Sequence, residues 1–264
     1  AVIGATGNVG REMMQTLWDR KFPVEKVIAL ASARSIGQEV SFGEDEVLKV
    51  QNLETFDFKG VDIALSSPGA KVSAVHSPRA AAAGCVVIDN TSYFRMDPDV
   101  PLVVPEVNPE AIARYKKKGI IANPNCSTIQ MLVALKPLHD EVGISRINVA
   151  TYQSVSGSGK EGVSELAGQT AHLLNGRPVE PTIYPQQIAF NLIPQIDSFT
   201  DNGYTREEMK MVWETQKILG DASIAVNPTC VRVPVFYGHA EAVHVELHQP
   251  LDAEQVKELL RNAP

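Results

Sequence analysis

The stretch Gly4-Ala-Thr-Gly7-Asn-Val-Gly10 follows a short apolar segment, Ala1–Ile3, and opens a helical pattern that runs to Arg20. Glycines spaced G-x-x-G-x-x-G between a strand and a helix are typical of a dinucleotide-binding turn. The first permits the tight turn, the second lets the backbone approach a pyrophosphate, and the third lets helix and strand pack closely. A plain glycine turn is the alternative interpretation. The predicted cofactor contacts here are Gly4, Thr6, Gly7, Asn8, Val9 and Gly10.

The rest of the first half alternates short apolar strands with helical stretches, which predicts a mostly parallel sheet covered on both faces. We therefore expect an α/β fold, with a Rossmann-type dinucleotide-binding domain over residues 1–123. The expected strands are Ala1–Ile3, Val27–Ala31, Ile63–Ser66, Val86–Asp89, Leu102–Val104 and Ile120–Ala122. The expected helices are Val9–Arg20, Ala70–Ala83 and Pro109–Lys117.

The residues after the second expected strand favour one cofactor over another. An acidic residue at that position binds a ribose 2′-hydroxyl and would repel a 2′-phosphate. The chain has Ser32, Arg34 and Ser35 there and no carboxylate. These side chains suit a phosphate, so NADP is predicted rather than NAD. Ser66 and Gly69 end a later strand at the same carboxyl edge of the sheet and are predicted to line the cofactor cleft.

Longer alternating strands, Ile147–Val155, Thr229–Tyr237 and Ala242–His248, dominate the second half. They predict a second α+β domain, residues 124–264, with a mixed or antiparallel sheet. A segment rich in Pro, Asn and Gln, Leu166–Ser198, lies between these strands and could cover a site or a partner subunit.

A capping box, Thr205-x-x-Glu208, opens a helix that runs to Leu219. Its expected apolar face is Met209, Val212, Trp213, Gln216 and Leu219. The opposite face carries Glu207, Lys210, Glu214 and Lys217, and at i,i+3 spacing these could simply be exposed ion pairs.

Composition excludes several classes of function. The formal net charge of −7 argues against nucleic acid or an anionic membrane surface as the main partner. No apolar run reaches the length of a membrane span, and no signal-peptide pattern opens the chain. The 3 cysteines suggest neither a disulfide framework nor a zinc site. We expect a cytoplasmic protein without a metal.

One cysteine lies where a thiol becomes a nucleophile. Asn123-Pro-Asn-Cys126-Ser-Thr128 precedes an apolar helical pattern, which puts Cys126 in the first turn of a helix. The backbone N–H groups and the positive dipole end of a helix stabilise a thiolate there. Cys85 and Cys230 lie in strand-like apolar surroundings, where burial is the simpler interpretation. Plain packing is the alternative for Cys126 as well.

A thiol nucleophile beside a nicotinamide suggests oxidation of an aldehyde through a thiohemiacetal to a thioester, which requires a base. His239 lies beside Gly238 at a turn between two strands and is the best candidate among the histidines. A metal site of His239, Glu241 and His244 is the alternative, but the chain lacks a helical H-E-x-x-H motif.

These residues resemble the aspartate-β-semialdehyde dehydrogenase family over nearly the whole chain. The motifs GATGNVG, DNTSYFRM, VPEVN, NPNCST, TYQSVSGSG and CVRVPVFYGHAE occur in that family's order. The resemblance implies reversible, NADP-dependent reductive dephosphorylation of aspartyl phosphate to aspartate semialdehyde, a step toward lysine, methionine and threonine. It also suggests a homodimer or a dimer of dimers, with Leu166–Ser198 as an expected part of the interface.

The resemblance also implies roles for single residues. Cys126 is similar to the attacking thiolate, His239 to the acid/base, and Gln153 to the residue that orients the acyl intermediate. Arg95, assisted by Lys210, would bind phosphate. Arg232 can grip the substrate α-carboxylate with a bidentate fork, and Glu207 would receive the α-ammonium group. A surface salt bridge is the alternative for Glu207 and Lys210. The remaining assignments are Asn125 to substrate binding and Ser156 and Gly157 to the cofactor.

Members of this family continue for some tens of residues, with a final helix that returns to the nucleotide domain. We expect that this return is missing from the 264 residues. N-acetyl-γ-glutamyl-phosphate reductase shares the chemistry and is the closest alternative, although Glu207 favours a substrate with a charged amino group. Glyceraldehyde-phosphate dehydrogenase has a different cysteine motif. A silent NADP-binding redox sensor would need neither Arg95 nor Arg232.

Overall fold

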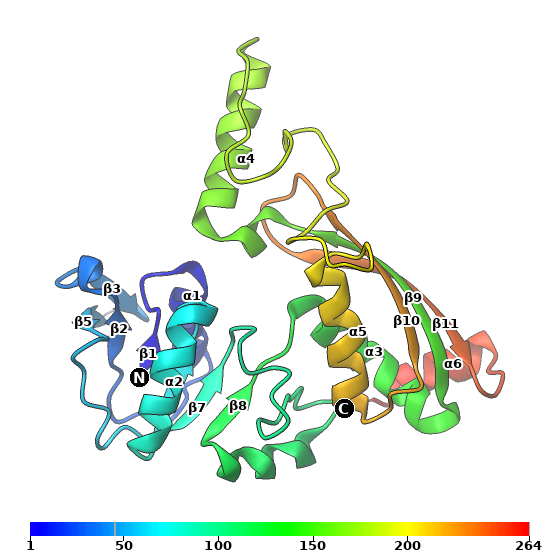
Figure 1. The fold of residues 1–264 in the computed structure, drawn as a ribbon, viewed down its shortest axis with the longest axis horizontal. Helices are drawn as coiled ribbons and strands as arrows, with labels where there is room; N and C mark the ends of the chain where they lie inside the picture. Colours follow the sequence, from blue (N-terminus) through cyan, green and yellow to red (C-terminus); the bar gives the residue numbers. More distant parts are fainter. Residues whose placement is uncertain (45, 264) are drawn as a thin grey trace. The chain divides into compact units, whose positions relative to one another are not determined.

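The computed structural model describes residues 1–44 and 46–263. The chain forms two compact units, Ala1–Pro124 and Asn125–Pro264, shown from blue to red along the sequence in Figure 1. Pro264, the last residue of the predicted second domain, lies outside the described residues. Each unit has its own sheet and helices, so each is described by itself.

The first unit is built on a parallel sheet with the strand order β5-β2-β1-β6-β7-β8. Strand β1 pairs with β2 on one side and with β6 on the other. The order therefore reverses at β1, which is where ligands bind in open α/β sheets. The strands are β1 (Val2–Ile3), β2 (Ala29–Ala31), β5 (Gln51–Asn52), β6 (Ile63–Ser66), β7 (Val86–Asp89) and β8 (Ile120–Ala122). The α-helices are α1 (Asn8–Asp19) and α2 (Ala70–Ala82).

Glycines allow the turn from β1 into α1. Gly4 has a φ of +85°, which is unfavourable for residues with a side chain. A Cβ atom on Gly10 would lie 2.8 Å from Cα of Ala5, so only glycine lets α1 approach the end of β1 this closely. Below this turn, Val2, Met14 and Ala29 are buried in one apolar core. The predicted roles of these two glycines in the turn are confirmed.

The first unit differs from its prediction at three places. A hairpin of β3 (Glu39–Phe42) and β4 (Glu46–Lys49) was not predicted, and neither was β5. The expected strand at residues 102–104 is reduced to one bridge, Leu102 to Ala122. The Asn108 side chain accepts the N–H of Val104 and donates to the carbonyl of Leu102, both at 2.9 Å, which withdraws these groups from the sheet. Residues 109–117 form the 3-10 helix η2 (Pro109–Lys117).

The second unit is built on a three-stranded sheet with the order β10-β9-β11. Strand β9 (Ile144–Gln153) pairs in parallel with β10 (Ala225–Arg232) and antiparallel with β11 (His239–Leu247), so the predicted mixed sheet is confirmed. The register aligns Gln153 with both Arg232 and His239. The remaining elements are α3 (Cys126–Val142), η3 (Val155–Ser158), α4 (Gly159–Leu174), α5 (Arg206–Leu219) and α6 (Ala253–Arg261).

Helix α5 buries a different face from the predicted one. Its capping box is confirmed, but Trp213 is 39% exposed, whereas Glu207 and Glu214 are buried. The predicted assignment of the glutamate face to solvent is wrong. The sequence pattern misleads because these carboxylates find hydrogen-bond partners inside the unit, which removes the usual cost of burying them. Within the predicted excursion, Tyr184 and Ile188 pack against Val155 in a buried cluster.

Candidate active site

The N-terminus of α1 is built to receive an anion. Gly7 is the N-cap of α1 and has no side chain that could accept a hydrogen bond. The first N–H groups of the helix are therefore not bound by a capping side chain. Gly7, Asn8 and Val9 are exposed, and Thr6 is half-buried. The Gly4 N–H donates to the carbonyl of Leu30 at 2.8 Å, which holds the loop at the carboxyl ends of β1 and β2. Open N–H groups at a helix N-terminus bind phosphate.

The residues predicted to choose the cofactor follow β2 directly. Ser32 and Arg34 are exposed and Ser35 is half-buried, in a short 3-10 turn, η1 (Ala33–Ser35), at the same sheet edge as the glycine loop. Gly69 is exposed at the start of α2. Ser66 differs, because its side chain is fully buried and its hydroxyl lies 3.4 Å from that of Ser77. Its hydroxyl therefore has no open face toward a cofactor.

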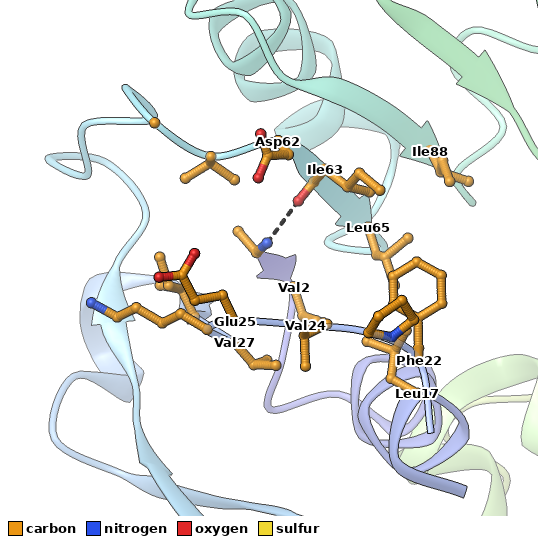
Figure 2. A pocket seen from close by; sticks show the side chains of 16 residues that line it. Val2, Leu17, Phe22, Val24, Glu25, Val27, Asp62, Ile63, Leu65 and Ile88 are labelled. Atoms are coloured by element: carbon orange, nitrogen blue, oxygen red, sulfur yellow. Dashed lines mark hydrogen bonds between the residues drawn. The ribbon is translucent and has the colours of Figure 1, made fainter. Parts of the chain in front are cut away.

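A cavity of about 320 Å³ in this unit, shown in Figure 2, lies at the other end of the sheet. Asp62 and Ile63, at the start of β6, line one side, and Val27, just before β2, lines another. The backbone nitrogen of Ala1 donates to the carbonyl of Ile63 at 2.7 Å beside it. Since the glycine loop is at the carboxyl ends of β1 and β2, this cavity is not the predicted nucleotide site.

Cys126 is the first residue of α3, and Asn125 before it is fixed in place. The Asn125 Oδ1 accepts the N–H groups of Ser127 at 3.0 Å and Thr128 at 3.4 Å, which caps the helix. Its Nδ2 donates to Glu207 Oε1 at 2.8 Å. Its backbone N–H donates to Glu214 Oε2 at 2.6 Å. The cap is therefore anchored to α5 at two points.

Exposure separates the three cysteines. Cys126 is exposed, whereas Cys85 and Cys230 are buried. Burial raises the pKa of Cys230 to about 12, and burial also raises the pKa of Cys85. Both buried thiols therefore stay protonated at neutral pH. This contrast supports Cys126, at a helix N-terminus, as the reactive thiol.

Gln153 lies at the centre of the buried hydrogen bonds below the α3 N-terminus. Its Nε2 donates to Ser127 Oγ at 2.9 Å and lies 3.2 Å from Thr151 Oγ1. It also lies 3.4 Å from Glu207 Oε1. Gln153 is 1% exposed, so its amide has a defined orientation beside the residue that follows Cys126.

Glu207 and Lys210 form a partly buried ion pair rather than the surface salt bridge that was the alternative. Lys210 Nζ lies 3.0 Å from Glu207 Oε2 and 3.1 Å from Asp197 Oδ2. Burial favours a higher pKa for Glu207, but Lys210, Asn125 and Gln153 together lower it. Burial favours a lower pKa for Lys210, but the two carboxylates raise it. Asp197, Glu207 and Lys210 are therefore all charged at neutral pH, and together they carry a net charge of −1.

Arg232 and His239 lie on either side of Gln153, one on each neighbouring strand. All three residues were predicted from the sequence to belong to one site. Burial lowers the pKa of Arg232, and electrostatic interactions with Tyr184 and Glu207 oppose that effect. The Arg232 Nη1 donates to the carbonyl of Ser154 at 2.6 Å. The Ser154 N–H donates to Nδ1 of His239 at 3.1 Å. A neutral His239 therefore carries its proton on Nε2.

Three further predicted residues are Arg95 of the first unit and Ser156 and Gly157 of the second. Arg95 belongs to the first unit, where it is buried and its Nη2 donates to the carbonyl of Asn90 at 3.1 Å. Ser156 and Gly157 lie on η3 in the second unit. The Ser156 hydroxyl is 2.9 Å from that of Ser154. A Cβ on Gly157 would lie 3.0 Å from Arg232 Nη1, so glycine leaves room for the guanidinium.

Sequence reasoning missed two residues of this network, Ser127 and Glu214. Glu214 follows Glu207 by two helical turns and so shares its face, which is a usable signal. Glu214 was missed because this face of α5 was interpreted as exposed to solvent. Ser127 lies inside the cysteine motif, but its contact with Gln153 depends on the pairing of β9, which no local pattern predicts.

Asn125→Ala should lower the free energy of unfolding by about 1 kcal/mol through loss of the cap, and kcat should fall as well because the α3 N-terminus loses its anchor. Asn125→Asp is the matched variant, since it keeps the capping oxygen but places a second carboxylate against Glu207. Denaturant unfolding and turnover measure the two effects. An Asn125→Ala protein with unchanged stability and kcat would show that the cap is dispensable.

Comparison with known proteins places this arrangement in a family. A family model described as "Semialdehyde dehydrogenase, NAD binding domain" matches residues 1–115, and one described as "Semialdehyde dehydrogenase, dimerisation domain" matches residues 135–264. Aspartate-semialdehyde dehydrogenase 2 of Vibrio cholerae is 66% identical over 98% of this chain and 77% of its own length. The chain belongs to the aspartate-semialdehyde dehydrogenase family.

Solved structures of this family agree with the fold. The crystal structure of aspartate semialdehyde dehydrogenase II complexed with ASA, from Vibrio cholerae, has a TM-score of 0.97 at 65% identity. The match covers 99% of this chain and 78% of the chain in that crystal structure. The crystal structure of aspartate semialdehyde dehydrogenase with NADP from Candida albicans has a TM-score of 0.75 at 30% identity. That match covers 99% of this chain and 75% of the Candida albicans chain.

These matches confirm the predicted family, the Rossmann-type first domain and the assignment to the oxidoreductases. No helix among the described residues is both long and apolar enough to cross a membrane. The described residues also contain no cluster of three or more metal-ligating side chains, so the alternative of a metal site at His239, Glu241 and His244 gains no support.

Proposed function

We propose that this protein catalyses the reversible, NADP-dependent reductive dephosphorylation of L-aspartyl 4-phosphate to L-aspartate 4-semialdehyde, through a thioester on Cys126. This step leads toward lysine, methionine and threonine. The observation that carries the proposal is the placement of Cys126. It is an exposed thiol at the first position of α3, and its neighbour Asn125 is anchored to Glu207 and Glu214.

In this proposal the Cys126 thiolate attacks the acyl carbon of aspartyl phosphate, and the bond to phosphate breaks. The negative phosphate needs a cation, which supports Arg95 with help from Lys210. Gln153 orients the acyl group next to the thiol. His239 gives a proton from Nε2 to the developing oxyanion and takes it back when the aldehyde leaves the thiol.

The first domain fits NADP by two features of its own residues. The uncapped N-terminus of α1 offers N–H groups to the pyrophosphate, and glycine at positions 4 and 10 lets the turn and α1 pack closely at the end of β1, which sets that N-terminus at the sheet edge. Ser32, Arg34 and Ser35 at the end of β2 offer two hydroxyls and a guanidinium to the 2′-phosphate. When bound, the nicotinamide would supply the electron pair that reduces the acyl group. Ser156 and Gly157 remain proposed cofactor contacts.

Arg34→Ala should raise KM for NADP by about tenfold or more and leave KM for NAD nearly unchanged, because a charged hydrogen bond to the 2′-phosphate contributes roughly 1.5–3 kcal/mol. Steady-state kinetics with both cofactors measures this change. Arg20→Ala, an exposed arginine after α1, serves as the control. If Arg34→Ala changed the two KM values equally, another residue would select the phosphate.

The substrate's charged groups match the second unit. Arg232 can pair with the α-carboxylate, and the net negative charge shared by Glu207, Lys210 and Asp197 suits an α-ammonium group. An N-acetylated substrate lacks that positive charge. The test is phosphate-dependent reduction of NADP with aspartate semialdehyde, repeated with the semialdehyde of N-acetylglutamate. Preference for the acetylated compound would identify the N-acetyl-γ-glutamyl-phosphate reductase activity instead.

We also propose that two copies of the chain associate through the second unit, as a homodimer or a dimer of dimers. The sheet face opposite α3 and α5 exposes Tyr152, Thr229 and Ala242, one from each strand. Neighbouring strands with small and aromatic side chains form a flat surface suited to a second copy. The segment Leu166–Ser198 remains a proposed part of this interface, and the proposed location of the protein is the cytoplasm.

A further inference from the structure

A cluster of buried polar side chains lies at the carboxyl ends of β6 and β7 in the first unit, and the proposed mechanism gives it no role. Its members are Ser66, which ends β6, Asp89, which ends β7, and two serines of α2, Ser73 and Ser77. All four side chains are fully buried. Burying such groups is costly unless they are hydrogen-bonded, so the partners of Asp89 show what the cluster holds in place.

The two oxygens of the Asp89 carboxylate have different partners. Oδ2 accepts the hydroxyl of Ser77 at 2.9 Å and also the hydroxyl of Ser73, both from α2. Oδ1 accepts the backbone N–H of Thr91 at 2.7 Å, two residues further along the chain. The serines of α2 therefore fix the orientation of the carboxylate, and the carboxylate fixes the N–H of Thr91.

The chain leaves the sheet directly after β7. The N–H of Asn90 donates to the carbonyl of Ser66 at 2.8 Å, and the N–H of Asn123 donates to the carbonyl of Asp89 at 2.8 Å. The peptide between Asp89 and Asn90 is therefore held by β6 on one side and by the residue after β8 on the other. The next peptide, between Asn90 and Thr91, is held by the side chain of Asp89 instead.

This second peptide connects Asp89 to the arginine proposed to bind phosphate. The N–H of Thr91 and the carbonyl of Asn90 are the two ends of one planar trans peptide, so they point in opposite directions. Asp89 binds the N–H end at 2.7 Å, and Nη2 of Arg95 donates to the carbonyl end at 3.1 Å. Because the peptide is rigid, the carboxylate that fixes one end also fixes the acceptor that Arg95 uses at the other.

Two further hydrogen bonds support the turn but act on other atoms. Asn123 Nδ2 donates to the side-chain oxygen of Asn90 at 2.6 Å, which holds that side chain rather than the peptide after it. The hydroxyl of Thr91 accepts the N–H of Tyr93 at 3.3 Å, which continues the turn toward Arg95. Neither bond takes the place of Asp89 in orienting the peptide between Asn90 and Thr91.

We propose that Asp89 is a positioning residue: through the peptide between Asn90 and Thr91, it holds the guanidinium of Arg95 in the orientation that binds phosphate. This inference rests on the proposed function, in which Arg95 binds the phosphate. A guanidinium binds phosphate best through two parallel N–H groups, which requires a defined orientation. Without Asp89, Arg95 keeps its charge but loses that orientation, so the binding of phosphate weakens more than the binding of the other reactants.

The test compares KM for phosphate, aspartate semialdehyde and NADP in the full-length enzyme. Asp89→Ala should raise KM for phosphate by about tenfold or more, because the N–H of Thr91 loses its acceptor, and should change the other two KM values less than about twofold. Asp89→Asn keeps an acceptor oxygen and should keep KM for phosphate within about threefold of the wild-type value. Asp62→Ala, an exposed aspartate at the opposite end of the sheet, is the control and should change none of the three.

Two more variants keep the test decisive. Joint replacement of Ser73 and Ser77 by alanine removes donors to the carboxylate but leaves Asp89 in place, so it serves if Asp89→Ala does not fold. It should raise KM for phosphate about threefold or more and leave the other two KM values nearly unchanged. Asp89→Ala added to Arg95→Ala should raise KM for phosphate no further, because the arginine through which Asp89 acts is gone.

An unchanged KM for phosphate in a folded Asp89→Ala protein, or a parallel rise of all three KM values, would overturn the inference. An Asp89→Asn protein as impaired as Asp89→Ala, or a full effect of Asp89→Ala on top of Arg95→Ala, would do the same. Broadening of the phosphorus NMR signal of inorganic phosphate measures binding without turnover, and Asp89→Ala should weaken it. If the wild-type protein failed to act on aspartate semialdehyde, the proposed function would fail, while the effect of Asp89 on phosphate binding would still be measurable.

Discussion

Replacing Cys126 by alanine is expected to lower kcat for phosphate-dependent NADP reduction with aspartate semialdehyde by at least about 10⁴-fold, because no thioester can form without the thiol. The loss should appear in kcat while the cofactor still binds, since the glycine loop belongs to the first unit. Stopped-flow or steady-state absorbance of NADPH measures it. The fold should persist, because Cys126 is exposed.

Cys85→Ala is the matched control. That thiol is buried and its pKa is raised, so it takes no part in the proposed chemistry and its loss should leave kcat within about twofold. Alkylation gives an independent reading, since iodoacetamide should label Cys126 in the wild-type protein and abolish turnover in parallel. A Cys126→Ala protein that turns over like the wild type would remove the nucleophile assignment altogether.

His239→Asn should lower kcat by roughly 10²–10⁴-fold, the usual contribution of a positioned acid or base. The Ser154 N–H donates to Nδ1, which leaves Nε2 as the proton donor of a neutral ring. Asparagine is similar in size but cannot transfer a proton near neutral pH. The pH profile of kcat/KM should also change, because the variant has lost its proposed acid/base.

The matched control for this change is His172→Asn on α4, an exposed histidine with no place in the proposed site. Its kcat should stay within about twofold of the wild-type value. Circular dichroism and the melting temperature show whether either variant has lost its fold. An unchanged pH profile in a folded His239→Asn protein would assign the proton transfer to another group.

The parts of the fold that the sequence predicts are those governed by local chemistry. The glycine turn after β1 is recognisable because only glycine tolerates its backbone and its close packing. The start of α3 is recognisable because Asn125 is a good N-cap and Pro124 precedes it. Strands β6, β7 and β8 were predicted at their observed bounds, since buried parallel strands are continuous apolar runs.

The parts that sequence reasoning missed depend on distant partners. The buried face of α5 carries Glu207 and Glu214 because Asn125, far away in the chain, donates to both carboxylates. An amphipathic pattern cannot reveal such partners. The row that aligns Gln153 with Arg232 and His239 arises from strand register, which is also a long-range property. The site therefore follows from the pairing of β9 as much as from its motifs.

The measurement that tests the central claim most directly is mass spectrometry of the enzyme mixed with aspartate semialdehyde and NADP in the absence of phosphate. Without phosphate to release the acyl group, the account predicts one aspartyl group bound to the peptide that contains Cys126, and its loss when phosphate is added. An active enzyme that carries no such adduct, or carries it on Cys85 or Cys230, would contradict the thioester on Cys126.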